Sequence, residues 1–384
     1  MKYEWTKKKL SDIADFNPRE TIKKGAIAKK IPMDVLRPFY RDIPYYVEEC
    51  FSGGTKFRNG DTIMARITPC LENGKTAQVS ILNDGEVGFG STEYIVFRAK
   101  KGIADKDYLY YLVCSPEVRE LAIKSMVGSS GRQRVQTDVV KNLEIDVPPL
   151  VKQEKIGSFL KAFDDKIALN DRINKNLEQQ AQAIYQQMFI DNASSDWTKG
   201  TLSDIADITM GQSPSGSSYN EDGNGTIFFQ GRAEFGFRFP TVRLYTTEPK
   251  RMACANDTLM SVRAPVGDLN VAHTDCCIGR GLATIHSKNN HQSFVLYTMF
   301  SLKKQLDVFN GEGTVFGSIN RNSLNEMSLL IPSSEKLDEF EALVAPMDAA
   351  IRNNYDEICR LEQLRDSLLS KLMSGELDVS DIEI

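Results

Sequence analysis

The chain has 384 residues, which is long enough for two or three domains that each bury a core. Its 41% hydrophobic and 26% charged residues and its mean hydropathy of -0.33 are typical of a globular protein, and no apolar run reaches the ~18 residues of a membrane helix. The net charge of -5 argues against an anionic partner, but Lys and Arg outnumber Asp and Glu by 24 to 20 in residues 1–150, whereas residues 334–384 hold 5 against 13. Because a polyanion responds to local charge, DNA is not excluded.

The N-terminus and the cysteines indicate a cellular location. MKYEWTKKKL lacks the apolar core of a secretory signal. Seven cysteines are present, none in a C-x-x-C pair, and Cys276 and Cys277 are adjacent. This pattern predicts reduced thiols in a cytoplasmic protein and no zinc site.

Several stretches of the first half return in the second. WTKKKLSDIADF (5–16) matches WTKGTLSDIADI (197–208) at nine of twelve positions, and GDTIMARITP (60–69) matches NDTLMSVRAP (256–265), both read as strands. FGSTEYIVF (89–97) and NLEIDVPPL (142–150) have counterparts in IGRGLATIH (278–286) and EMSLLIPSS (326–334). An internal duplication with a period of about 190 residues is predicted, with globular domains in residues 1–150 and 193–333.

A long helix is predicted after each domain, in residues 151–192 and in residues 334–384, which include a C-terminal tail. Seam residues step by three and four over about four heptads, which indicates a coiled coil. We expect the helices to pack antiparallel as a rod with one globule at each end, and the second to break or restart near Pro346. The seam residues are Leu160, Phe163, Ile167, Asn170, Leu177, Ile184, Met188, Met347, Ile351, Asn354, Ile358, Leu361, Leu368 and Leu372.

Asn170 and Asn354 occupy the same seam position in the two helices. A buried Asn is stable only opposite a polar partner, so the pair is a candidate for specifying the register. The alternative is that both are tolerated where the seam is partly wet.

Motifs of catalysis are missing from the sequence. It has no G-x-x-x-x-G-K-[ST] loop and no G-x-G-x-x-G after a strand. His273, His286 and His291 lack metal-ligand spacing. Val147-Pro148-Pro149-Leu150 only approaches the adenine methyltransferase tetrapeptide, and Asp164-x-Lys166 lies on the predicted coiled coil without a second acid. The chain is therefore predicted not to be an enzyme.

Side chains suited to DNA recur in the first domain. Arg and Gln read guanine and adenine through paired hydrogen bonds, while Lys, Ser and backbone N–H groups hold phosphates. Each of these features also has a structural explanation. The lysines could form a solvated face, and the strand-end Arg could form a salt bridge. The glycine-serine loop VGSSGRQRV (127–135) could be a hairpin that is merely flexible. The candidates are Lys23, Lys24, Lys29, Lys30, Arg66, Ser129, Ser130, Arg132, Gln133 and Arg134.

In the second domain the candidates come mainly from loops. GQSPSGSSYNEDGNG (211–225) precedes the strand IFFQGRAEFGFRF, and loops of this length tend to be functional or disordered. NGEGTVFGSINRN (310–322) takes the place of the first domain's glycine-serine loop. The candidates are Gln212, Ser215, Tyr219, Asn220, Gln230, Arg232, Arg263, Ser318 and Asn320.

Over its whole length the chain resembles the specificity subunit of type I restriction–modification systems. The resemblance is carried by the tandem W-x-x-x-x-L-S-D-I-A-D openings, by the Gly-rich loop leading to LEIDVPPLVKQEKI, and by LRDSLLSKLMSGEL (364–377).

The resemblance implies an α/β (α+β) fold with two target recognition domains separated by two long antiparallel coiled-coil helices. Each domain would read one half of a bipartite DNA site, and the helices would fix the spacer and dock two modification subunits, using shared stretches at 177–189 and 361–373. Those subunits would bind S-adenosylmethionine and methylate adenine N6, with a restriction/translocase subunit where restriction is encoded. The chain itself would hold no cofactor.

Three alternatives remain at this stage. One is a specificity subunit of a methylation-only or other phage-defence complex. The second is a stand-alone DNA methyltransferase, which the missing cofactor motif disfavours. The third is a coiled-coil scaffold or transcription factor, which explains the heptads but not two divergent globules.

Overall fold

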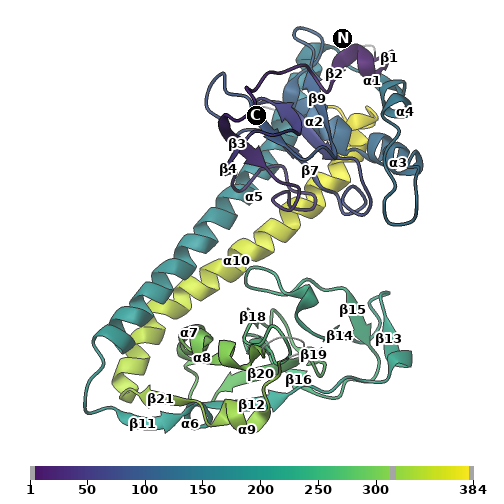
Figure 1. Ribbon diagram of the computed structural model, residues 1–384. Helices are drawn as coiled ribbons and strands as arrows, with labels where there is room; N and C mark the ends of the chain where they lie inside the picture. Colours follow the sequence, from purple (N-terminus) through teal and green to yellow (C-terminus); the bar gives the residue numbers. More distant parts are fainter. Residues whose placement is uncertain (1–4, 312–316, 380–384) are drawn as a thin grey trace. The chain divides into compact units, whose positions relative to one another are not determined.

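The computed structural model describes residues 5–311 and 317–379 and forms two compact units (Figure 1). Unit 1 comprises Met1–Asp171 and Tyr355–Ile384, and unit 2 comprises Arg172–Asn354. The long helices α5 (Leu150–Tyr185) and α10 (Ser334–Met373) each contribute to both units.

Unit 1 contains two four-stranded sheets and a separate strand pair. One sheet is antiparallel, in the order β2 (Ala14–Phe16), β9 (Tyr94–Ala99), β6 (Thr62–Ala65), β7 (Thr76–Gln78). The other has the order β4 (Val47–Cys50), β3 (Ile27–Ile31), β8 (Gly88–Gly90), β5 (Thr55–Phe57), with β3 and β8 parallel. The strand pair is β1 (Thr6–Lys9) with β10 (Glu144–Val147), and the short helices are α1 (Leu10–Ile13), α2 (Lys106–Cys114), α3 (Pro116–Lys124) and α4 (Thr137–Lys141).

Unit 2 repeats this plan with one additional strand. Its antiparallel sheet has the order β12 (Ala206–Met210), β20 (Leu282–Ser287), β17 (Thr258–Ser261), β18 (Leu269–Val271). The second sheet gains one short strand: β13 (Tyr219–Asn220), β15 (Leu244–Thr246), β14 (Thr226–Phe229), β19 (Cys276–Ile278), β16 (Met252–Ala253), with β14 and β19 parallel. Strand β11 (Thr198–Thr201) pairs with β21 (Ser328–Ile331), and the helices are α6 (Leu202–Ile205), α7 (Gln292–Ser301), α8 (Lys303–Asp307) and α9 (Arg321–Asn325). The predicted duplication and mixed fold are therefore present.

The repeated LSDIAD phrase has one structural role in both units. It forms the single-turn helices α1 and α6, whose Leu and Ile are buried. The Asp at the third helical position accepts a hydrogen bond from the backbone N–H just before the helix, from Lys9 at 2.9 Å and from Thr201 at 2.7 Å. This capping arrangement satisfies a donor that the helix leaves unpaired, and the following Ala begins β2 or β12.

The long helices are part of each unit's core. In unit 1, Leu369, Leu372 and Met373 of α10 join the buried cluster formed by α1, α2 and the antiparallel sheet. In unit 2, the α5 chain ends in a π-helical turn, Gln186–Asp191, whose Phe189 ring lies 4.9 Å from Phe294 of α7 and 5.1 Å from Phe340 of α10. The globular part of each unit is thus packed onto the long helices by apolar contacts.

Helices α5 and α10 are antiparallel, as predicted (Figure 1). In unit 1, Asp164 pairs with Arg365, and Asn170 donates to Glu357 at 2.7 Å. In unit 2, Asn354 donates to Asn174 at 2.8 Å. The partner number falls as the residue number rises, which requires antiparallel pairing, and both seam asparagines have the polar partner that a buried amide needs.

All predicted seam residues are at least half-buried. Leu160, Ile167, Asn170, Ile351, Ile358 and Leu372 are buried, while Phe163, Leu177, Ile184, Met188, Met347, Asn354, Leu361 and Leu368 are half-buried. Toward the end of α5 the buried positions are Tyr185 and Phe189, one residue later than the predicted Ile184 and Met188. The larger rings of Tyr185 and Phe189 pack in the aromatic cluster of unit 2, whereas Ile184 and Met188 are only half-buried.

The expectation that the second helix breaks near Pro346 is wrong. Helix α10 runs without interruption from Ser334 to Met373 with Pro346 inside it. Proline removes the hydrogen bond to the carbonyl four residues earlier, here that of Ala342. Both residues are exposed, so water can hydrate that carbonyl, while Phe340 and Val344 remain buried on the opposite side.

Replacing Pro346 with Ala is expected to stabilise unit 2 by about 2 kcal/mol. An interior proline costs a helix about 3 kcal/mol, of which about 1 kcal/mol is offset by the lower entropy of the unfolded chain. Urea unfolding of the full chain measures the change. The exposed Ala345→Ser substitution is the control, and a P346A variant less stable than the parent contradicts the argument.

Three further properties concern the described residues. Within them no helix has the length and apolarity needed to span a membrane. They contain no group of three or more His, Cys, Asp or Glu residues that could hold a metal ion. All seven cysteines are free thiols.

Candidate nucleic-acid interface

In unit 1, one face is assembled where strand β6 ends. The Arg66 backbone donates to Glu93 O in the β8–β9 turn at 2.9 Å and accepts from Val135 N at 2.9 Å. Thr68 N donates to Gln133 O at 3.0 Å. These bonds hold the loop 127–134 beside the strand end and the β8–β9 turn.

Unit 2 builds the same face with the same backbone bonds. Val262 N donates to Gly281 O at 2.9 Å, Ile319 N to Val262 O at 3.1 Å, and Ala264 N to Gly317 O at 3.0 Å. A cis X–Pro bond follows in both units, at Pro69 and Pro265. Positions 312–316 of the predicted loop 310–322 lie outside the described residues. Two equivalent faces, one per unit, are therefore candidates for binding.

The glycine-serine loop of unit 1 presents part of its predicted set. Gly128 and Gly131 adopt φ values of +136° and +77°, which favour glycine, and Ser129, Ser130 and Arg132 are exposed. Arg134 is already engaged, because its guanidinium donates to Glu93 at 2.7 Å. This hydrogen bond raises the pKa of Arg134. Gln133 is half-buried, so Arg132 is the most available of the side chains predicted to read bases in this loop.

The four predicted lysines do not form one ridge. Lys23 and Lys24 are exposed in the turn before β3, and no carboxylate of the described residues pairs with either. Lys29 is buried, 3.0 Å from Glu86 and over the ring of Tyr46, and it cannot reach a phosphate. Lys30 is paired with Glu49 at 2.8 Å. The prediction is corrected at Lys29, whose partner Glu86 lies on a distant segment.

Lys23→Ala is therefore expected to weaken duplex binding equally for all sequences. Loss of one phosphate contact lowers the slope of log K against log salt by about 0.9. Lys29→Met is expected to leave that slope unchanged, because its ammonium is held by Glu86. Fluorescence anisotropy over a salt series, with the assembled complex, measures both slopes. Equal slopes in K23A and the parent protein contradict the assignment.

Arg66 and Arg263 both follow the strands β6 and β17, but they do not occupy equivalent positions. The matching backbone bonds pair Arg66 with Val262, so Arg263 corresponds to Ile67. Successive strand residues point to opposite faces. Accordingly Arg66 is half-buried with its Nε shielded, whereas Arg263 is exposed.

The long loop 211–225 is ordered by its own polar groups. Asn220 bonds the backbone of Asn224 through both ends of its amide, at 2.8 and 3.0 Å. The Tyr219 ring lies 4.8 Å from that of Phe228 and its hydroxyl donates to Pro214 O. Ser215 is exposed and bonds Ser217. Tyr219 and Asn220 thus shape the loop, which leaves Gln212 and Ser215 as its exposed candidates.

Other predicted residues of unit 2 have local partners. Arg232 is ion-paired with Asp268. The Asn320 side chain caps α9 by accepting from Ser323 N at 2.9 Å. Ser318 is exposed and forms a bridge with Arg263. Of these three side chains, that of Ser318 alone is exposed and bonded by no other residue that the structure describes.

The β19–β20 turn of unit 2 gathers four exposed side chains that suit base edges. Gln212 N donates to Ile278 O at 3.0 Å, and Gly281 N donates to Gln230 O at 3.3 Å, so both glutamines flank the turn. Arg263 follows Val262, which bonds Gly281. The fourth is Arg280, which the sequence analysis missed. Its signal was the G-R-G tripeptide, an arginine held between two glycines just after a buried strand.

Comparison with known proteins identifies the family. A model of the type I restriction modification DNA specificity domain matches residues 2–179 and 194–352. The protein assigned as specificity subunit of the type I restriction enzyme MjaX, from Methanocaldococcus jannaschii, is 29% identical over 413 residues, covering 98% of this chain and 94% of that protein. The EcoAI specificity subunit of Escherichia coli is 34% identical over 159 residues, covering 40% of this chain and 26% of that protein.

A solved structure shares the fold. The S subunit of a type-I restriction-modification system from M. genitalium has a TM-score of 0.60 at 15% identity, over 97% of this chain and 96% of that one. Two matches of one family model, on two units whose strands correspond apart from the additional β13, show that this chain belongs to the type I restriction-modification DNA specificity family and carries two copies of its domain.

Proposed function

We propose that each unit reads one half of a bipartite, asymmetric DNA site through the face at the end of β6 or β17. The observation that carries the proposal is one backbone scaffold bearing different exposed side chains in the two units. Unit 1 presents Arg132 and two serines, whereas unit 2 presents two glutamines and two arginines. Two faces that differ in this way suit two different half-sequences.

The chain acts as the non-catalytic specificity component of its complex. The family description and the names of its relatives are those of specificity domains and subunits. We infer a cytoplasmic complex in which S-adenosylmethionine is bound by the modification subunits, with restriction/translocase subunits where they are encoded.

We further infer that α5 and α10 set the unread spacer and dock two modification subunits. Exposed apolar side chains on the helices support docking: Val151, Leu169 and Leu364 in unit 1, Ile173 and Leu343 in unit 2. Their exposed fractions, between 38% and 56%, are those of residues left uncovered by the chain itself.

Co-expression with the modification subunit, followed by sequencing of host DNA for N6-methyladenine, tests the function. A split motif with a fixed spacer is expected. Replacing residues 197–333 by those of a relative is expected to change one half of the motif only. Methylation by this chain alone, or none by an active complex, contradicts the proposal.

A further inference from the structure

A buried arginine of unit 2 joins the globule to both long helices. Arg238, between the turn Arg232–Glu234 and β15, is 4% exposed. Its guanidinium lies 3.0 Å from Glu178 of α5 and 3.0 Å from Asp348 of α10. Tyr297 of α7 donates to the same Asp348 at 2.9 Å. One side chain therefore contacts both helices of the pair.

Unit 1 has a counterpart in the same place. Arg41 O accepts from Gln78 N in β7 at 3.0 Å, just as Arg238 O accepts from Val271 N in the equivalent β18 at 2.8 Å. The Arg41 guanidinium is buried and donates to Asp165 of α5 at 2.6 Å.

The tyrosine–aspartate pair is duplicated as well. Tyr111 of α2 donates to Asp164 of α5 at 2.6 Å, as Tyr297 does to Asp348. Arg37 and Tyr40, from the segment that carries Arg41, both bind Asp171 of α5, at 2.8 and 2.9 Å. Each globule is thus held on its helix by one arginine segment and one tyrosine.

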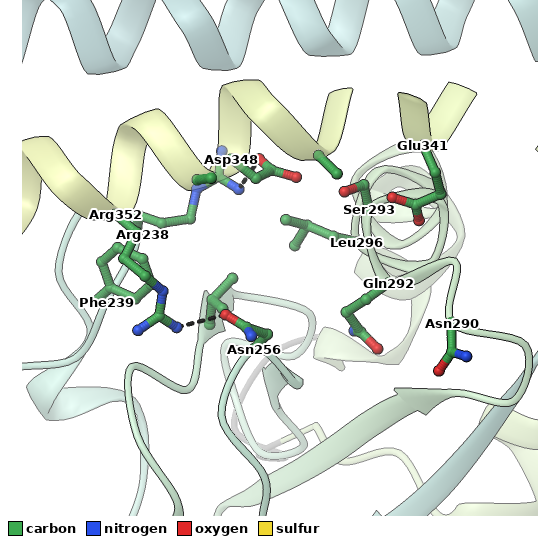
Figure 2. A pocket seen from close by; sticks show the side chains of 13 residues that line it. Arg238, Phe239, Asn256, Asn290, Gln292, Ser293, Leu296, Glu341, Asp348 and Arg352 are labelled. Carbon is green, nitrogen blue, oxygen red and sulfur yellow. Dashed lines mark hydrogen bonds and ion pairs between the residues drawn. The ribbon is translucent and has the colours of Figure 1, made fainter. Parts of the chain in front are cut away.

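The two attachments differ in the helix residues that lie beside them. In unit 1, Lys161 of α5 pairs with Asp165 at 2.6 Å beside Arg41. The corresponding α10 residues are Ala345 and Ala349, which line a pocket of about 350 Å³ between helix and globule in unit 2 (Figure 2). Arg352 of α10 also bonds the globule at the rim of this pocket, through Asn256 and the backbone oxygens of His273 and Ala272, so Arg238 is the buried member of two arginines that join unit 2 to its helices.

Such an attachment restricts geometry more than it adds stability. A buried ion pair offsets its desolvation only at good geometry, so it penalises other orientations of its partners. Burial raises the pKa of Glu178, although Arg238 opposes this. A tilt of the globule on the helices would leave these charges buried and unpaired.

We propose that Arg238 and its counterpart Arg41 are positioning residues that fix the angle of each recognition domain on the helix pair, and through it the permitted spacer length. This inference rests on the proposed function. The ligand is the same DNA duplex as in the proposed function. Arg238 and Arg41 would limit how far apart its two half-sites can lie.

The test uses Arg238→Lys and Glu178→Gln in the full chain, assembled with its modification subunits. A lysine makes a single point contact and cannot bridge both acids. Methylation is measured on a library that keeps both half-sites and varies the spacer by one or two base pairs on either side. Methylation at the neighbouring spacers, relative to the natural one, is expected to rise about tenfold, with both half-sequences unchanged.

Lys336→Met is the matched control, since the exposed Lys336 pairs with Glu339 on α10 itself. It is expected to keep the natural spacer. Glu178→Gln retains the side-chain shape, so it tests the idea even if Arg238→Lys fails to fold. A folded variant that keeps the single spacer overturns this inference alone. A wild-type protein without a split motif overturns the proposed function, and the inference with it.

Discussion

Replacing Asp164 with Ala is expected to lower the free energy of unfolding by about 3–5 kcal/mol, because it strands a buried cation. The side chains of Asp164 and Arg365 are 5% and 7% exposed and lie 2.6 Å apart. Burial lowers the pKa of Arg365, but its two aspartate partners raise it further, so the guanidinium stays charged. The variant also deprives the Tyr111 hydroxyl of its acceptor.

Thermal and urea unfolding of the full chain measure this loss. For a unit of about 200 residues, the expected fall in Tm is about 6–20 °C. The triple variant D164L/R365M/Y111F removes the three buried members of the network, and it is expected to recover most of the stability because no buried charge is left alone. Asp366→Asn, at the 59%-exposed second partner of Arg365, is expected to cost less than about 1 kcal/mol. Equal losses in D164A and D366N contradict the argument.

The position of Asp164 also shows what the sequence could and could not reveal. The helix carrying it was predictable, because seam residues repeat over several heptads and a long periodic pattern is a strong signal. The duplication was equally visible, since LSDIAD performs the same capping and burial twice. Asp164 itself, which the sequence showed only as an acid on the coiled coil without a second acid, is a structural partner of Arg365, which lies 201 residues away.

Several candidate residues of the interface are likewise paired with residues that are distant in the sequence. Lys29, Arg134 and Arg232 are residue types that bind DNA. In the folded chain they form ion pairs with Glu86, Glu93 and Asp268. Arg280 had no periodic pattern to mark it, and only the packing of neighbouring loops shows that it stands beside Gln212 and Gln230. The helix break at Pro346 was wrongly predicted because helix propensity takes no account of where the lost hydrogen bond lies. Here it faces solvent.

The largest functional effect of a single substitution is expected at the β19–β20 turn. Arg280→Ala and Arg263→Ala are each expected to reduce methylation of the cognate site by a factor between about 5 and 150, since one paired contact to a base is worth about 1–3 kcal/mol. Both guanidiniums are exposed, and no carboxylate in the described part of the chain holds them.

The pattern of the loss matters more than its size. If these arginines read bases, sequencing of N6-methyladenine is expected to show relaxed preference at one or two positions of a single half-site, while the other half and the spacer stay as in the parent protein. Arg232→Ala is the matched control from the same unit, because Asp268 already occupies its guanidinium, and it is expected to change neither preference nor rate appreciably. A uniform loss over all positions, with a smaller salt dependence, would instead assign Arg263 and Arg280 to phosphates. In that case Gln212 and Gln230 would be left as the base-reading side chains of the turn, and the same sequencing experiment on their alanine variants would locate the positions they read.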